Sequence, residues 1–164
     1  MTAFMRTLLL LSLLLAVSYS AGAQTAAPGF AVVSLDDSSA LITDALLKGK
    51  VYLVDFWATW CPPCVEELPE LTRLYEKYRG RNFEILSLSF DNSREHVRRF
   101  RAKRFSMPWL HGLVELGFGD YLADVFHVKN IPRQILIDSA GFIDAEDDEL
   151  RGAQLEKTLE KYLR

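Results

Sequence analysis

The sequence predicts an α/β fold in which helices flank a central mixed β-sheet, with a short strand extension at the N-terminus. Segments with strand patterns alternate with segments of helical periodicity, and this alternation is typical of sheets whose faces are covered by helices. The run at 51–58 is mostly apolar, as expected of a strand that is buried on both faces. The length of 164 residues and the 25% of charged residues suit one globular domain.

The N-terminal 23 residues have the pattern of a secretory signal peptide. Arg6 precedes an apolar run at 8–17 that is too short to span a bilayer comfortably, and small residues follow at 21–23. We therefore expect cleavage after Ala23, a folded domain over residues 24–164 and a periplasmic location. A retained segment would instead anchor the protein, or associate it transiently, at the membrane.

The first half of the domain is expected to begin with a short tether at 24–28. Two short strands at 30–33 and 40–42 follow it, around a polar turn, and the buried strand at 51–58 comes next. Two prolines then open a helix whose apolar side chains recur at helical spacing until Gly80.

The second half continues the alternation of strands and helices. A strand is expected at 83–90, where apolar and polar residues alternate, and Ser93 is a suitable N-cap for a helix that runs through Arg104. The remaining predicted elements are a short helix at 120–127, a strand at 134–138, a turn into a further strand near Phe142, and an amphipathic helix at 154–163.

Cys61 and Cys64 lie where the buried strand ends and the proline-opened helix begins. Unpaired N–H groups at the start of a helix favour a thiolate on Cys61, and Cys64 can resolve a mixed disulfide one turn later. We expect Cys61 to be the exposed nucleophile and Cys64 the buried resolving residue. A bridge that closes so short a loop stabilises a fold little, which favours a redox-active disulfide, with no other cofactor, over a structural staple.

Other uses of the cysteines fit the sequence less well. A zinc site needs about four ligands, and the 3 histidines are scattered, so we expect no metal. His111 and Met107 keep a copper-delivery module open as an alternative. A thiol peroxidase is a second alternative, although Thr59 is displaced by one position and the accompanying proline is absent. The net charge of −3 argues against nucleic acid as a partner.

The segment from Val54 to Cys64, VDFWATWCPPC, resembles the active-site segment of the thioredoxin superfamily, and most closely its exported TlpA/ResA-like branch. The resemblance extends from Pro28 to the last helix. It implies a thioredoxin fold and thiol–disulfide oxidoreductase activity. Pro69 matches a helix-kinking proline of the family, and Ile131-Pro132 matches the loop in which the family has a cis proline, so Pro132 is expected to be cis beside the disulfide.

The same resemblance implies two kinds of partner. They are client proteins that carry disulfides and an upstream electron donor in the membrane. Cytochrome c maturation is one role of the family, in which an apocytochrome CxxCH disulfide is reduced.

Asp55 and Glu67 are the candidate acid–base residues. A lone carboxyl in an apolar strand is costly to bury in its charged form, so the pKa of Asp55 should be raised, and Asp55 could accept the proton of Cys64. A solvated or hydrogen-bonded structural role is the alternative for Asp55. Glu67 follows Cys64 by three positions and therefore shares its face of the helix; simple solvation is the alternative for Glu67.

The surroundings of the cysteines favour a reductant over an oxidant. Pro62 and Pro63 lack the N–H groups that could stabilise a thiolate. No His or Lys lies between the cysteines, and Glu66 and Glu67 follow them, so nearby negative charge disfavours the thiolate. Strong oxidants depend on a stabilised reduced form. The residues expected to form the client-docking surface are Trp60, Pro62, Pro63, Ile131 and Arg133, the last of which would select an acidic partner.

Overall fold

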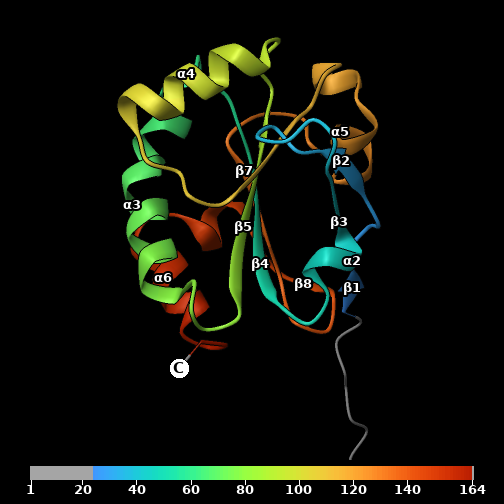
Figure 1. The fold of residues 1–164 in the computed structure, drawn as a ribbon. Coiled ribbons are helices and arrows are strands. Elements are labelled where there is room, and N and C mark those ends of the chain that lie inside the picture. The colour runs from blue at the N-terminus through green and yellow to red at the C-terminus, as the bar shows by residue number, and fades with distance from the viewer. Residues whose placement is uncertain (1–23, 164) are drawn as a thin grey trace, which may run out of the picture.

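A six-stranded sheet forms the centre of the computed structural model, which describes residues 24–163. The predicted signal peptide therefore lies outside the described residues. The strand order is β1-β8-β7-β4-β5-β6 (Figure 1). β4 (Val51–Trp57) pairs in parallel with β5 (Phe83–Ser89) and antiparallel with β7 (Arg133–Ile137). The predicted α/β fold with a mixed central sheet is confirmed.

Short strands complete both edges of the sheet. β6 (Leu110–Leu113) lies parallel to β5, and β8 (Phe142–Glu146) lies antiparallel to β7. β1 (Thr25–Ala26) pairs with β8. The expected tether at 24–28 was thus wrong in part, because two of its residues extend the sheet. Two residues are too few to show a strand pattern in a sequence.

Helices cover the two faces of the sheet. Figure 1 shows α3 (Pro62–Tyr78) and α6 (Ala153–Leu159) on one side, and α2 (Asp44–Leu47) and α5 (Tyr121–Val125) on the other. The hairpin of β2 (Ala31–Val33) and β3 (Leu41–Thr43) lies on the side of α5. Along the chain, α4 (Arg94–Arg104) follows β5, and two short 3₁₀ helices, η1 (Gly117–Gly119) and η2 (Asp147–Leu150), precede α5 and α6. In Figure 1, α4 lies at the end of the molecule above α3.

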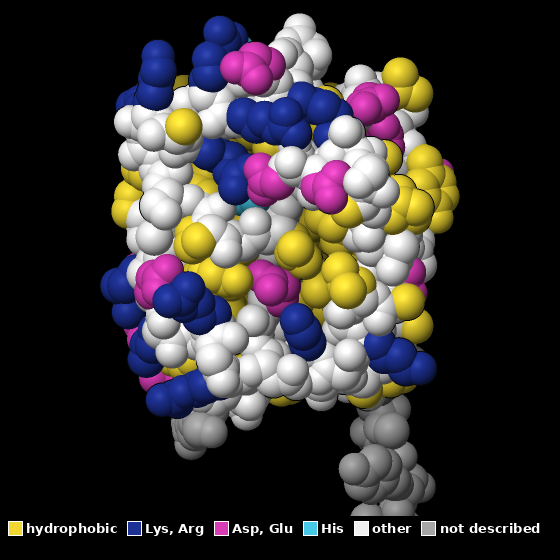
Figure 2. Space-filling view, viewed as in Figure 1, with side chains coloured by type: hydrophobic (Ala, Val, Ile, Leu, Met, Phe, Trp, Pro, Cys, Tyr) yellow, Lys and Arg dark blue, Asp and Glu magenta, His cyan; other side chains and the backbone are white. Residues whose placement is uncertain are grey.

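Burial explains why the central elements form where the sequence predicts them. β4 is buried at every position, which accounts for its continuous apolar run. Trp57 at its end is fully buried and contacts Phe100 of α4, with ring centroids 5.6 Å apart. Ser93 caps α4 as predicted, because its Oγ accepts a hydrogen bond from the N–H of His96. Lys and Arg side chains gather over α4 on the surface in Figure 2.

Helix α3 carries the cysteine motif at its start. Cys61 is the N-cap, prolines occupy the first two helical positions, and the helix continues through Pro69 to Tyr78. Prolines are tolerated at the start of a helix because the N–H groups there have no partner in the helix. Within residues 24–163, no helix combines the length and the apolar character needed to cross a membrane.

Gly112 sets how closely the hairpin packs on the sheet. It lies in β6, and a Cβ added there would be 2.7 Å from Cγ2 of Val32 and 2.9 Å from Cδ2 of Leu88. Ser34, which follows β2, forms a β-bridge to Gly112. The absence of a side chain at this position therefore allows the hairpin to lie against the sheet.

We predict that Gly112→Ala lowers the free energy of unfolding by about 1–3 kcal/mol, the usual cost of overpacking a core. Urea unfolding of the oxidised protein measures this. Gly80→Ala is the matched control, because an added Cβ there meets no atom within 4 Å, and it should change the free energy by less than about 0.5 kcal/mol. Equal stability of the two variants would contradict this account of the packing.

Candidate active site

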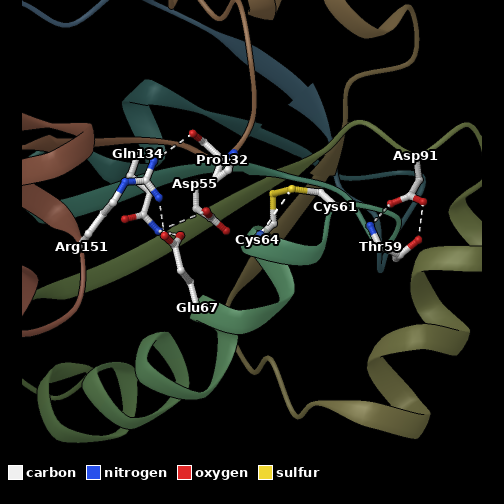
Figure 3. Close-up of a disulfide and its surroundings, with 9 residues drawn as sticks. All are labelled: Asp55, Thr59, Cys61, Cys64, Glu67, Asp91, Pro132, Gln134 and Arg151. Atoms are coloured by element: carbon white, nitrogen blue, oxygen red, sulfur yellow. Dashed lines mark hydrogen bonds and ion pairs between the residues drawn. A yellow bond between two sulfur atoms is a disulfide. The ribbon is translucent and has the colours of Figure 1, made fainter.

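The cysteine pair lies between the end of β4 and the first turn of α3. Cys61 and Cys64 form a disulfide (Figure 3). The Sγ of Cys61 accepts a hydrogen bond from the N–H of Cys64 at 3.3 Å. The expected exposure of Cys61 is wrong for this oxidised form, since the two residues are 4% and 3% exposed. The disulfide ties Cys61 to the first turn of α3, so both sulfurs are covered.

The loop before Cys61 is held by a buried carboxylate that the sequence analysis missed. Asp91 accepts hydrogen bonds from the backbone N–H and the Oγ1 of Thr59, at 2.9 and 2.6 Å. The Oγ of Ser89 also donates to Asp91, at 2.7 Å. Because Trp57 and Ser89 are partners in the parallel register of β4 and β5, the residues that follow these two strands meet at one edge. The sequence offered one sign of this role, an aspartate that comes two residues after the end of β5.

The proline loop reaches the same edge of the sheet. The Ile131–Pro132 peptide bond is cis, as the family resemblance implied. Arg133, the next residue, is the register partner of Phe56 in β4. Pro132 is therefore level with the end of β4, where the cysteine segment begins.

Asp55 is a buried carboxyl in the middle of the sheet. It is 2% exposed and accepts a hydrogen bond from the Oγ of Ser87 at 2.9 Å. The indole N–H of Trp109 donates in turn to Ser87 at 2.8 Å. Burial raises the pKa of Asp55 to about 7, against the effect of the hydrogen bond from Ser87. A carboxyl with such a pKa can hold or release a proton near neutral pH.

Glu67 is linked to Asp55 through one amide group. The Nε2 of Gln134 donates to Glu67 Oε2 at 3.1 Å and to Asp55 Oδ1 at 3.5 Å. Glu67 also forms an ion pair with Arg151. Burial raises the pKa of Glu67, and the guanidinium of Arg151 opposes that rise. The sequence placed Glu67 on the face of Cys64 but gave no sign of Gln134 or Arg151, which come from distant segments.

The expected docking residues divide into two groups. Trp60 is 59% exposed, Pro62 and Pro63 are exposed, and Ile131 is half-buried. Arg133 differs, because its guanidinium forms ion pairs with Glu146 and Asp147. The charge of Arg133 is thus neutralised within the protein, and we withdraw the expectation that it selects an acidic partner.

Further apolar side chains are exposed near this end of the sheet. Phe118 of η1 packs on Phe90, which follows β5, with ring centroids 4.7 Å apart. Leu116, Phe118 and Tyr121 are exposed, and Figure 2 shows hydrophobic side chains over the neighbouring surface around α5.

His111 is placed away from the cysteines. It lies on β6 and is the register partner of Ser87 on β5, which in turn is the partner of Asp55 on β4. Two strand spacings thus separate His111 from Asp55. The ring Nε2 of His111 donates to the carbonyl of Met107 at 3.0 Å, and burial lowers the pKa of His111 to about 3. Across residues 24–163, no cluster of three or more His, Cys, Asp or Glu side chains could hold a metal ion.

We predict that the stability of Asp55→Asn, measured relative to that of the wild type, increases as the pH rises. The pKa of Asp55 is raised in the folded state from 3.8 to about 7, so the stabilisation from its bound proton is present at low pH and is lost on approaching pH 7. Across this window, the free energy of unfolding of the variant should rise relative to that of the wild type by about 1.4 kcal/mol per pH unit. Urea unfolding of both oxidised proteins between pH 4 and 8 tests this, and parallel profiles would contradict it.

Comparison with known proteins identifies the family. A family model described as thioredoxin-like matches residues 49–143. The chain is 32% identical over 138 residues to the thiol–disulfide oxidoreductase ResA of Bacillus thuringiensis subsp. konkukian, an alignment that covers 84% of this chain and 75% of that protein. ResA of Geobacillus thermodenitrificans is 30% identical over 148 residues, which cover 84% of this chain and 82% of that protein.

Solved structures show the same likeness. The thioredoxin domain of a thiol–disulfide oxidoreductase from Bacteroides vulgatus superposes with a TM-score of 0.76 at 28% sequence identity, covering 88% of this chain and 100% of that one. The fold, the sequence similarity and the disulfide between β4 and α3 agree with one another. The chain belongs to the thioredoxin-like family, as a thiol–disulfide oxidoreductase of the ResA type with a Cys-x-x-Cys pair.

Proposed function

We propose that the protein is an exported reductant of disulfides in other proteins. The observation that carries this proposal is the disulfide at the N-terminal end of α3, where two prolines separate the cysteines and Glu66 and Glu67 follow them. Such surroundings supply little stabilisation to a thiolate. A dithiol whose reduced form is poorly stabilised gives up its electrons readily.

The proposed cycle transfers two electrons to the client. The thiolate of Cys61 attacks one sulfur of the client disulfide, and the other client sulfur leaves with the electron pair and takes up a proton. Cys64 then attacks Cys61, which releases the second client sulfur and leaves the Cys61–Cys64 disulfide. Cys64 is a thiol before this step, so a base must take its proton, and Asp55 is the proposed acceptor.

Export is proposed from the sequence pattern of the first 23 residues, which is that of a secretory signal. Glutathione and thioredoxin keep thiols reduced in the cytosol, whereas an exported protein meets oxidising conditions. An electron donor in the membrane is therefore the proposed source of reducing equivalents. An apocytochrome c with an oxidised CxxCH motif is the client we propose to test first, on the strength of the family resemblance.

We predict that Cys61→Ala abolishes the reduction of insulin by dithiothreitol above the rate without protein, because no thiolate remains to attack the client. Cys64→Ala should accumulate a mixed disulfide between Cys61 and a client peptide, visible on non-reducing gels and by mass spectrometry. A turbidity assay of insulin measures the first effect. Wild-type activity in the Cys61 variant would overturn the proposed order of the two cysteines.

We predict a reduction potential nearer the roughly −270 mV of thioredoxin than the roughly −120 mV of DsbA. Pro63→His should make the potential less negative by about 30 mV or more, a tenfold change in the equilibrium constant, because an imidazolium beside the pair stabilises the thiolate. Equilibration with glutathione measures both values.

Glu76→His, at the exposed far end of α3, is the control for the introduction of a histidine and should leave the potential unchanged. A wild-type potential close to that of DsbA would refute the proposal of a reductant.

A further inference from the structure

Arg151 connects three parts of the active site that are distant in the sequence. It directly follows η2, and its Nη1 forms an ion pair with Glu67 on α3. Its Nη2 donates to the carbonyl oxygen of Pro132 at 3.2 Å. Its Nε lies 3.5 Å from Asp148, an exposed carboxylate on its own segment. Figure 3 shows the guanidinium on the side of Asp55 and Cys64 that faces away from Thr59.

The two carboxyl groups of this network have different surroundings. Asp55 is enclosed by the sheet and accepts hydrogen bonds from Ser87 of β5 and Gln134 of β7. The charges that act on it are those of Glu67 on α3 and of Arg151, and Cys64 is drawn beside it in Figure 3. Glu67 has one fifth of its side chain exposed. It borders a hollow of about 120 Å³ that Gln134, Glu66 and Glu70 also line.

That hollow has room for a few water molecules, each of which occupies about 30 Å³ in the liquid. Glu67 therefore borders a space that water can enter and is paired with the cation Arg151. Asp55 has neither advantage. Because their surroundings differ, two neighbouring carboxyl groups can have different pKa values.

We propose that Arg151 is a positioning residue that holds Glu67 as a carboxylate and anchors the carbonyl of Pro132, so that the proton released by Cys64 passes to Asp55 and not to Glu67. The inference rests on the proposed role of Cys64 as the resolving residue. Without the guanidinium, Glu67 would compete with Asp55 for the proton, and the loop of Pro132 would lose its link to the C-terminal segment.

The atoms and electrons of the resolving step are balanced by Cys61, Cys64, Asp55 and the client. The Sγ of Cys64 loses its proton to Asp55 and forms a bond to the Sγ of Cys61. The bond between Cys61 and the client sulfur breaks, and the client sulfur leaves with the electron pair. The cysteine pair is oxidised by two electrons over the whole cycle, and the client disulfide is reduced by two.

The signs of the electrostatic effects make the proposal testable. The negative charge of Glu67 raises the pKa of Asp55, and the positive charge of Arg151 lowers it. Removal of Arg151 should thus move the acid limb of the resolving step to higher pH. Removal of the charge on Glu67 should move it to lower pH.

The experiment is a single-turnover reaction of the reduced protein with a disulfide-bonded peptide, followed between pH 5 and 9. In Arg151→Met the midpoint of the acid limb for peptide release should rise by about one pH unit, as expected for loss of a cation close to a carboxyl pair. In Glu67→Gln the midpoint should fall. Arg151→Lys keeps the charge, so its midpoint should lie between those of the wild type and Arg151→Met. It provides the test if the Met variant fails to fold.

The matched control is Arg73→Met. Arg73 joins α3 to α6 through an ion pair with Glu156 and also pairs with Glu70 of its own helix. Neither of its ion-pair partners is Asp55 or Glu67. Its profile should coincide with that of the wild type. A profile of Arg151→Met that coincides with the wild type would overturn the proposal, as would an equal shift when Arg151→Met is made in the Asp55→Asn background.

Different results would exclude the proposed function and the proposed role of Arg151. If the wild type does not reduce insulin, the proposed function is wrong whatever Arg151 does. If the wild type is active and the midpoints of the Arg151 and Glu67 variants move in the same direction, only the role of Arg151 is wrong.

Discussion

A carboxyl group buried in the central strand is the constraint on which the site depends. An unpaired charge at that depth is strongly disfavoured, and Asp55 is 2% exposed. The protein surrounds it with polar groups from the two neighbouring strands and from the residue before β6. Ser87 and, behind it, Trp109 supply one chain of donors, and Gln134 supplies an amide. These contacts offset part of the desolvation and leave a pKa of about 7, so that Asp55 can exchange a proton near neutral pH.

Strand register brings the rest of the site to this carboxyl. β4 and β5 run in parallel with Trp57 opposite Ser89, and β7 begins opposite Phe56. The loop that holds Asp91, the loop that holds Pro132 and the cysteine segment therefore meet at one edge. A slip of one residue in either pairing would turn Ser87 or Gln134 to the opposite face of the sheet and leave Asp55 without that donor.

The sequence predicted those features that are set by local pattern. β4, β5, α3 and α4 have strong periodicity and caps, and each was located to within about two residues. β1, α2 and β6 were missed, because they are two to four residues long and such segments have too few positions to show a period. Their pairing partners lie far away in the chain.

The residues of the site also divide into those that the local sequence pattern predicts and those that only the fold brings together. Cys61, Cys64, Asp55 and Glu67 were found because they lie within one continuous segment around the strand and the helix. Gln134 and Arg151 were missed, because only the folded topology brings them to Glu67. Arg133 was misjudged for the same reason: the carboxylates that pair with it belong to the next hairpin strand and to η2, and a flanking cation in a sequence gives no sign of its partner.

Under the proposed mechanism, the residues that would handle the proton lie on a different side of the disulfide from those that precede Cys61. In Figure 3 the disulfide lies between two groups of polar residues, with Thr59 and Asp91 on the side of Cys61 and with Asp55, Glu67, Gln134 and Arg151 on the side of Cys64. Trp60, Pro62 and Pro63 are exposed and adjoin Cys61 in the sequence, which is the proposed nucleophile, while the acids lie on the side of Cys64, the proposed resolving residue. The hollow beside Glu67 is lined by residues of α3, β7 and the C-terminal segment and by none of the exposed residues Trp60, Pro62 and Pro63, so the proposed proton acceptor and the proposed docking residues lie on different parts of the site.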